Sequence, residues 1–224
     1  MGVGHVALAL GASRAAPRMN VGWLVFAALL ADFLLGIFAA LGLEHSTAPA
    51  DYASKHYLLF TFPYSHGLLA LGVWGIIAGF LVSRVYSFDA KRVLIVIALV
   101  VLSHYLLDGL VHVAGLPLAG EDSPKFGLGL WKHMPLELGI ETVMSVVGIA
   151  VYWKLAGARR SAVARWGMAL FVALVTALTW TQLAATEAPS SKQLAVSWIV
   201  VPLVFGVIAY ALDRGRVRAA ALGG

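Results

Sequence analysis

Three ionisable residues lie four positions apart in the segment "LSHYLLDGLVH", residues 102–112, within a long apolar run. They are His104, Asp108 and His112. Residues i, i+4 and i+8 share one face of an α-helix, because four helical residues turn about 400°. An ionisable side chain at the centre of a membrane costs about 2.5–3.5 kcal/mol on insertion scales. The three residues are therefore predicted to line a polar interior and to avoid lipid.

A second stripe has the same spacing. His133, Glu137 and Glu141 fall four residues apart in "WKHMPLELGIE". Asp32 lies within another apolar run, and His66 follows in "FPYSHGLL". We expect both stripes to face the interior of a helix bundle, where, with Asp32 and His66, they would form a polar cavity that opens outward.

Imidazole and carboxylate side chains, without any cysteine, indicate a site for Zn, Mn or Fe. An i, i+4 pair presents two ligands on one helix face. A metal there could lower the pKa of a bound water to about 7. Glu137 and Glu141 are the candidate catalytic carboxylates, with Glu137 placed to act as general base.

A serine nucleophile has little support, since the chain has no G-x-S-x-G elbow. P-loop and dinucleotide-binding motifs are also absent. Ser65 and Ser103 each precede a key histidine, but residues adjacent in sequence point to different helix faces. Both serines are interpreted as local hydrogen-bond partners.

The elements that must position these residues are membrane-spanning helices. Of the 224 residues, 61% are hydrophobic and 12% are charged, whereas a soluble domain has about 25% charged residues. The composition predicts an all-α, polytopic membrane helical bundle in a single integral membrane domain, 1–224. A short apolar stretch, 2–13, is predicted to form an interfacial or re-entrant helix. Six segments are long enough to span: 21–43, 64–86, 93–114, 131–154, 166–186 and 194–213.

Twelve of the sixteen Lys and Arg residues lie on one side of this arrangement, in the N-terminal segment, 84–92, 154–165 and the C-terminal tail. The positive-inside rule makes that side cytoplasmic and both termini internal. Basic residues spread between apolar runs indicate topology, so no nucleic-acid partner is expected. The loops 44–63 and 115–130 are long enough to cover the outward-facing cavity.

The motifs "GHVALAL", "PYSHGLL", "LSHYLLDGLVH" and "KFGLGLW", with an aspartate in the first span, follow one another in that order. Over residues 1–155 the chain resembles the bacterial membrane-bound metal-dependent hydrolase-like family, of the LexA-regulated inner-membrane protein type. That family is distantly likened to zinc-dependent phospholipase C. Residues 166–213 add two further spans. The resemblance implies a metal-ligand set of His5, Asp32, His66, His104 and Asp108. It also implies a location in a bacterial inner membrane.

His5 enters this set from the resemblance alone. A re-entrant segment of about ten helical residues rises roughly 15 Å, which would bring His5 near the middle of the membrane. The first span has one carboxylate, in "LLADFLL", where many relatives have a Pro-Asp-Leu-Asp type run. The single carboxylate argues against a two-metal site.

Three functions remain open on the sequence. The first is a metal-dependent hydrolase, with Zn as the expected metal, acting on an ester or phosphoester of a lipid-like substrate. The second is a proton- or cation-coupled permease that uses the same His, Asp and Glu residues as a relay. The third is a non-catalytic subunit of a larger membrane complex. Membrane lipids are expected partners in each case.

Overall fold

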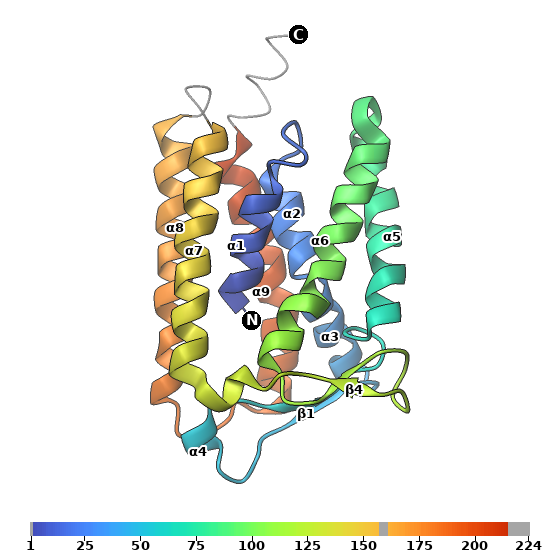
Figure 1. Cartoon of the computed structure of the whole chain (residues 1–224), viewed down its shortest axis with the longest axis vertical. Coiled ribbons are helices and arrows are strands. Elements are labelled where there is room, and N and C mark those ends of the chain that lie inside the picture. The colour runs from blue at the N-terminus through green and yellow to red at the C-terminus, as the bar shows by residue number, and fades with distance from the viewer. Residues whose placement is uncertain (1, 157–160, 215–224) are drawn as a thin grey trace.

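The computed structural model describes residues 2–156 and 161–214 as a bundle of long, roughly aligned helices (Figure 1). It contains five helices long and apolar enough to cross a membrane, and a sixth crossing if a bent pair is counted as one. The predicted all-α membrane bundle is confirmed. The long helices are α5 (Leu68–Val85), α6 (Ala90–Val111), α7 (Met134–Ala156), α8 (Ala162–Trp180) and α9 (Ser191–Leu212).

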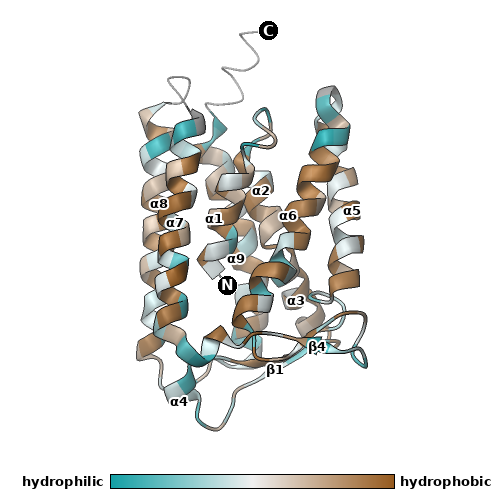
Figure 2. Ribbon diagram, viewed as in Figure 1, coloured by the Kyte–Doolittle hydropathy of each residue, from teal (hydrophilic) through white to brown (hydrophobic). Residues whose placement is uncertain are grey.

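The outer faces of these helices are strongly apolar. Leu69 and Leu81 on α5 are 64% and 61% exposed, and Val207 on α9 is 67% exposed. Figure 2 shows hydrophobic residues along the length of the helices, with hydrophilic residues mainly at the ends. A continuous apolar surface of this kind is stable against lipid and not against water, so the chain is a multi-pass membrane protein.

Capping side chains mark the starts of α8 and α9. The Ser161 side chain caps α8 by accepting from the backbone of Ala164. At α9, Ser190 and Gln193 form a reciprocal capping box. These caps satisfy backbone N–H groups that have no partner within the helix.

The first span is broken, although one continuous helix was predicted over 21–43. α2 (Val21–Ala28) and α3 (Leu30–Ala40) meet at Leu29 with a bend of 50°. No proline or glycine lies at the break. The Nδ1 atom of His104 approaches the carbonyl oxygen of Ala28 to 2.7 Å. A side chain that takes a carbonyl from the helical ladder is an established cause of a kink, and it explains the bend.

The short helix α1 (Gly2–Ala12) has eleven residues, too few to span a membrane. It begins inside the bundle and runs toward one end, as Figure 1 shows. It packs closely on α7, since a Cβ atom placed at Gly148 would lie 2.7 Å from the Ala7 carbonyl oxygen. The predicted additional N-terminal helix is therefore present, and it is enclosed by the other helices.

Two small hairpins lie together at one end of the bundle, which we call the hairpin end (Figure 1). β1 (His45–Thr47) pairs with β2 (Leu59–Thr61), with α4 (Tyr52–Lys55) between them, and β3 (Leu116–Pro117) pairs with β4 (Lys125–Phe126). The short 3₁₀ helices are η1 (Ser87–Asp89), η2 (Leu130–His133) and η4 (Thr181–Ala184).

The loops 13–20 and 86–89 lie at the opposite end of the bundle (Figure 1). They are on the side predicted to be basic. Four of the basic residues on which that prediction rests lie outside the described residues: Arg159, Arg160, Arg216 and Arg218.

Candidate metal centre

Asp108, on the last turns of α6, is surrounded by four imidazoles. The Nε2 atom of His5 lies 3.1 Å from Asp108 Oδ1. The Nε2 atoms of His104, His112 and His66 lie 3.3, 3.2 and 3.7 Å from Asp108 Oδ2. All five side chains are buried. Four nitrogen atoms directed at one carboxylate form a dense set of possible metal ligands.

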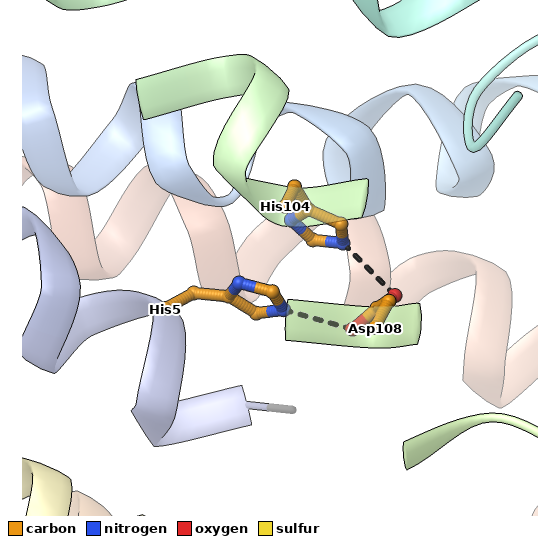
Figure 3. A group of neighbouring side chains, drawn as sticks. All are labelled: His5, His104 and Asp108. Atoms are coloured by element: carbon orange, nitrogen blue, oxygen red, sulfur yellow. Dashed lines mark hydrogen bonds and ion pairs between the residues drawn. The ribbon is translucent and has the colours of Figure 1, made fainter. Parts of the chain in front are cut away.

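Three separate segments bring these groups together. α6 supplies His104 and Asp108, and His112 is the residue that ends α6. His5 comes from α1, and its ring stacks on that of His104 with centroids 3.8 Å apart and planes at 4°. Figure 3 shows Nε2 atoms of both rings directed at Asp108. His66 precedes the start of α5 at Leu68.

All five predicted metal ligands belong to this cluster. Asp32, from α3, places Oδ1 3.8 Å from the Nε2 atom of His66. Within the described residues, two triplets have their ligand atoms within 4.8 Å of one another: His5, His104 and Asp108, and Asp32, His66 and His104. His104 is common to both.

His104 provides the test of whether a metal fits. A carbonyl oxygen can only accept, so the Nδ1 atom of His104 carries the hydrogen that it donates to Ala28. Unless the ring holds a second proton, Nε2 carries a lone pair. That atom is buried without a hydrogen-bond partner in the described part of the chain, and it faces an oxygen of Asp108 at 3.3 Å. A cation between these two electron-rich atoms would satisfy both.

The two serines behave as the sequence predicted. Ser103 donates to the carbonyl oxygen of Val100 at 2.6 Å. The hydroxyl oxygen of Ser65 lies 2.7 Å from His66 Nδ1 and 2.7 Å from Glu44 Oε2. Burial raises the pKa of the Glu44 carboxyl, and hydrogen bonds from Ser65 and Tyr64 oppose this rise.

An open cavity of about 610 Å³ is lined by four residues of the cluster: Asp32, His66, Asp108 and His112. His5 and His104 are not among its lining residues in the described part of the chain. α8 and α9 give this cavity an apolar wall that includes Val175, Leu178, Val201 and Phe205. Its polar lining residues near the cluster are Asp32, His66, Asp108, His112, Glu137 and Glu141.

The loop 44–63 also lines the cavity, through Tyr52, His56, Tyr57 and other residues, as expected of a covering loop. No residue of the loop 115–130 is among the lining residues in the described part of the chain. That loop instead bonds to the end of α6, where Leu128 and Gly129 donate to the carbonyl oxygens of Gly109 and His112. Of the two loops, 44–63 is thus the one that contributes lining residues to the cavity in the described part of the chain.

The second predicted stripe is only partly correct. Glu137 and Glu141 on α7 are each 2% exposed, and the backbone N–H of Gly4 donates to Glu141 Oε1 at 3.4 Å. His133 was expected on the same face, but it is exposed. It belongs to the 3₁₀ helix η2 (Leu130–His133), whose tighter winding of about three residues per turn rotates it off the face used by α7.

Two histidines have a larger part in the site than the sequence indicated. His112 is 5% exposed, and its ring contacts Trp131 with centroids 4.0 Å apart. Its four-residue spacing from Asp108 was the available signal, although the ligand set implied by the resemblance did not include it. His56, in the loop 44–63, lines the cavity and has a buried Nδ1 atom. No sequence pattern marked it.

Comparison of the chain with protein families, curated proteins and solved structures finds no match. The family resemblance of the motifs therefore stays a prediction, and the function has to be argued from the geometry of the site.

Proposed function

We propose that the chain is a membrane-embedded, metal-dependent hydrolase acting on an ester or phosphoester of a lipid-like substrate. One observation carries the proposal. The buried Nε2 atom of His104 has no hydrogen-bond partner within the described residues and faces Asp108, which lines an open, largely apolar cavity. Such a donor set, placed where a substrate can reach it, is what a catalytic metal site requires.

The expected occupant is one divalent metal ion. The two ligand triplets share His104, and the Nδ1 atom of that ring already donates to Ala28. His104 therefore has one nitrogen to offer, which favours a single metal. Histidine and carboxylate ligands suit Zn best, and Mn or Fe would also bind such a set. The ligands would be drawn from His5, Asp32, His66, His104 and Asp108.

A bound metal would supply Lewis acidity and lower the pKa of a water. Glu137 lines the cavity and can take the proton released by that water. Glu141 has a second task, because it accepts a hydrogen bond from the first turn of α1 and so helps to hold the helix that carries His5.

The shape and charge of the cavity support a lipid-like substrate. Apolar side chains of α8 and α9 line the wall beside the polar cluster, as a site for a hydrocarbon chain requires. No Lys or Arg is among the lining residues in the described part of the chain. The protein itself thus offers no cation for a phosphate group, so uncharged esters are the first substrates to test and phosphoesters the second.

We also propose a bacterial inner-membrane location with the hairpin end outside. The positive-inside rule applied to the basic loops supports this orientation. The cavity, whose lining includes the loop 44–63, would then receive substrate from the outer leaflet.

The proposal is tested on protein purified in detergent without chelators. We expect about one equivalent of Zn, Mn or Fe by mass spectrometry, consistent with a single site of this ligand type. We also expect metal-dependent release of fatty acid or headgroup from a panel of lipid esters and phosphoesters, lost with EDTA and restored by the metal. Folded protein without metal and without hydrolysis would contradict the proposal and direct the next experiment to proton-coupled transport in liposomes.

Replacing Glu137 by Gln separates catalysis from metal binding. We expect the Glu137→Gln variant to retain its metal and to lose hydrolysis by about 10²- to 10⁴-fold, the usual contribution of a general base. Glu187→Gln, at an exposed position, is the matched control. Loss of the metal together with activity would place Glu137 among the ligands, and unchanged hydrolysis would exclude it as the base.

A further inference from the structure

A chain of short hydrogen bonds links Glu44 to His66 through Ser65. Glu44 and Ser65 are 1% and 0% exposed. Ser65 is not among the residues that line the cavity. A hydroxyl without access to the cavity cannot attack a substrate there. The hydrogen bonds from Glu44 through Ser65 to His66 must therefore have another role.

The positions of the hydrogen atoms in this series of hydrogen bonds can be worked out. Glu44 Oε1 accepts from the backbone N–H groups of Tyr64 and Ser65, at 2.7 and 2.9 Å. The hydroxyl of Ser65 has one hydrogen, which it donates to Glu44 Oε2 at 2.7 Å. Its oxygen must then accept from the Nδ1 atom of His66, which lies 2.7 Å away. The hydrogen of a neutral His66 ring therefore resides on Nδ1.

The other nitrogen of His66 faces the candidate metal centre. With the hydrogen on Nδ1, Nε2 has a free lone pair. It lies 3.8 Å from Asp32 Oδ1 and 3.7 Å from Asp108 Oδ2, too far for a hydrogen bond to either. This nitrogen is thus in the form that ligates a metal.

We infer that Glu44 is a positioning residue of the metal centre, acting through Ser65 to hold His66 as the Nδ1–H tautomer with Nε2 directed at the ligand cluster. The role of this tautomer in binding metal rests on the proposed function. The tautomer itself follows from the hydrogen bonds of Glu44 and Ser65 alone. Partners that orient a ligating imidazole through its second nitrogen are common around metals in proteins.

A purely structural role for Glu44 makes a different prediction. In that case the carboxylate would only anchor the turn at Tyr64 and Ser65, and Glu44→Gln would leave the tautomer of His66 unchanged. Glu44→Gln keeps this anchor, because the amide oxygen can still accept both backbone N–H groups. The amide nitrogen would then donate to Ser65, whose hydroxyl could only donate onward to His66 Nδ1. The hydrogen of His66 moves to Nε2, and the lone pair that would bind metal is lost.

The tautomer can be measured by NMR of metal-free protein with ¹⁵N-labelled histidine, with the His66 signals assigned from a His66→Asn variant. We expect Nδ1–H in the wild type and Nε2–H in Glu44→Gln. Glu121→Gln, at an exposed carboxylate that pairs with Lys125, should leave the tautomer unchanged. Ser65→Ala, which removes the bridging oxygen, should give both tautomers, and Ser65→Thr should restore Nδ1–H.

Titration with Zn²⁺ provides the second readout. We expect Glu44→Gln and Ser65→Ala to weaken Zn²⁺ binding by about 10- to 100-fold, the usual effect of losing such a partner. Ser65→Thr and Glu121→Gln should bind as the wild type does. An Nε2–H tautomer in the wild type, or an unchanged tautomer in both Glu44→Gln and Ser65→Ala, would overturn the inference. The expected tautomers without any Zn²⁺ binding by the wild type would support the role of Glu44 and contradict the metal site.

Discussion

Asp108→Asn is expected to remove the metal from the purified protein. The side chain keeps its size, but one oxygen that faces the imidazoles becomes an NH₂ group, which cannot ligate a metal. Asp108 lies within 3.7 Å of four histidine Nε2 atoms, so its substitution affects most of the candidate ligands at once. We expect a loss of Zn²⁺ affinity beyond the roughly 100-fold upper range for an outer-shell partner, with hydrolysis lost in parallel.

Metal content by mass spectrometry and Zn²⁺ titration measure this effect. Asp122→Asn, at an exposed position in the loop 115–130, is the control for loss of one carboxylate and should behave as the wild type. A folded Asp108→Asn protein that retains a full equivalent of metal would show that the ligands lie elsewhere.

Gly148→Val is expected to damage the site from a distance. A Cβ at this position would lie 2.7 Å from the Ala7 carbonyl oxygen and 2.9 Å from Ala7 Cα. Both are backbone atoms of α1 and cannot rotate away, so the whole helix has to move off α7 and carry His5 with it. Overpacking of this kind costs about 1–3 kcal/mol. We expect a melting temperature several degrees lower and Zn²⁺ affinity reduced to that of His5→Ala.

Gly139→Val is the matched control on the same helix, since a Cβ there meets nothing within 4 Å. Thermal unfolding in detergent and Zn²⁺ titration of the two valine variants decide the prediction. Equal melting temperatures and equal affinities would mean that the contact between α1 and α7 does not position His5.

Local patterns predicted the parts of the site that depend on one helix. The four-residue spacing of His104, Asp108 and His112 was sufficient to predict that all three are buried, the first two on α6 and His112 directly after its last residue. The same reasoning succeeded for Glu137 and Glu141 and was wrong for His133, because periodicity assumes one helix type and the chain changes from 3₁₀ to α before Met134.

Other features depend on contacts between distant parts of the chain. The break at Leu29 coincides with a hydrogen bond from His104 to Ala28, which are 76 positions apart. No residue type near Leu29 predicts this break from the sequence. Glu44 is the first residue of the loop 44–63, and no sequence pattern marks it. Its role becomes visible only when folding brings it to Ser65, 21 residues further along the chain.

The position of α1 has a consequence for how the protein is made. The hydrogen bond from Gly4 to Glu141 joins residues 137 positions apart. At a synthesis rate of about 5–20 residues per second, Glu141 follows Gly4 by on the order of ten seconds. Through that interval α1 is too short to cross the bilayer and has neither α6 nor α7 to enclose it. We therefore expect α1 to stay at the membrane surface until α6 and α7 are inserted. The helix that is translated first would then be the last to join the site.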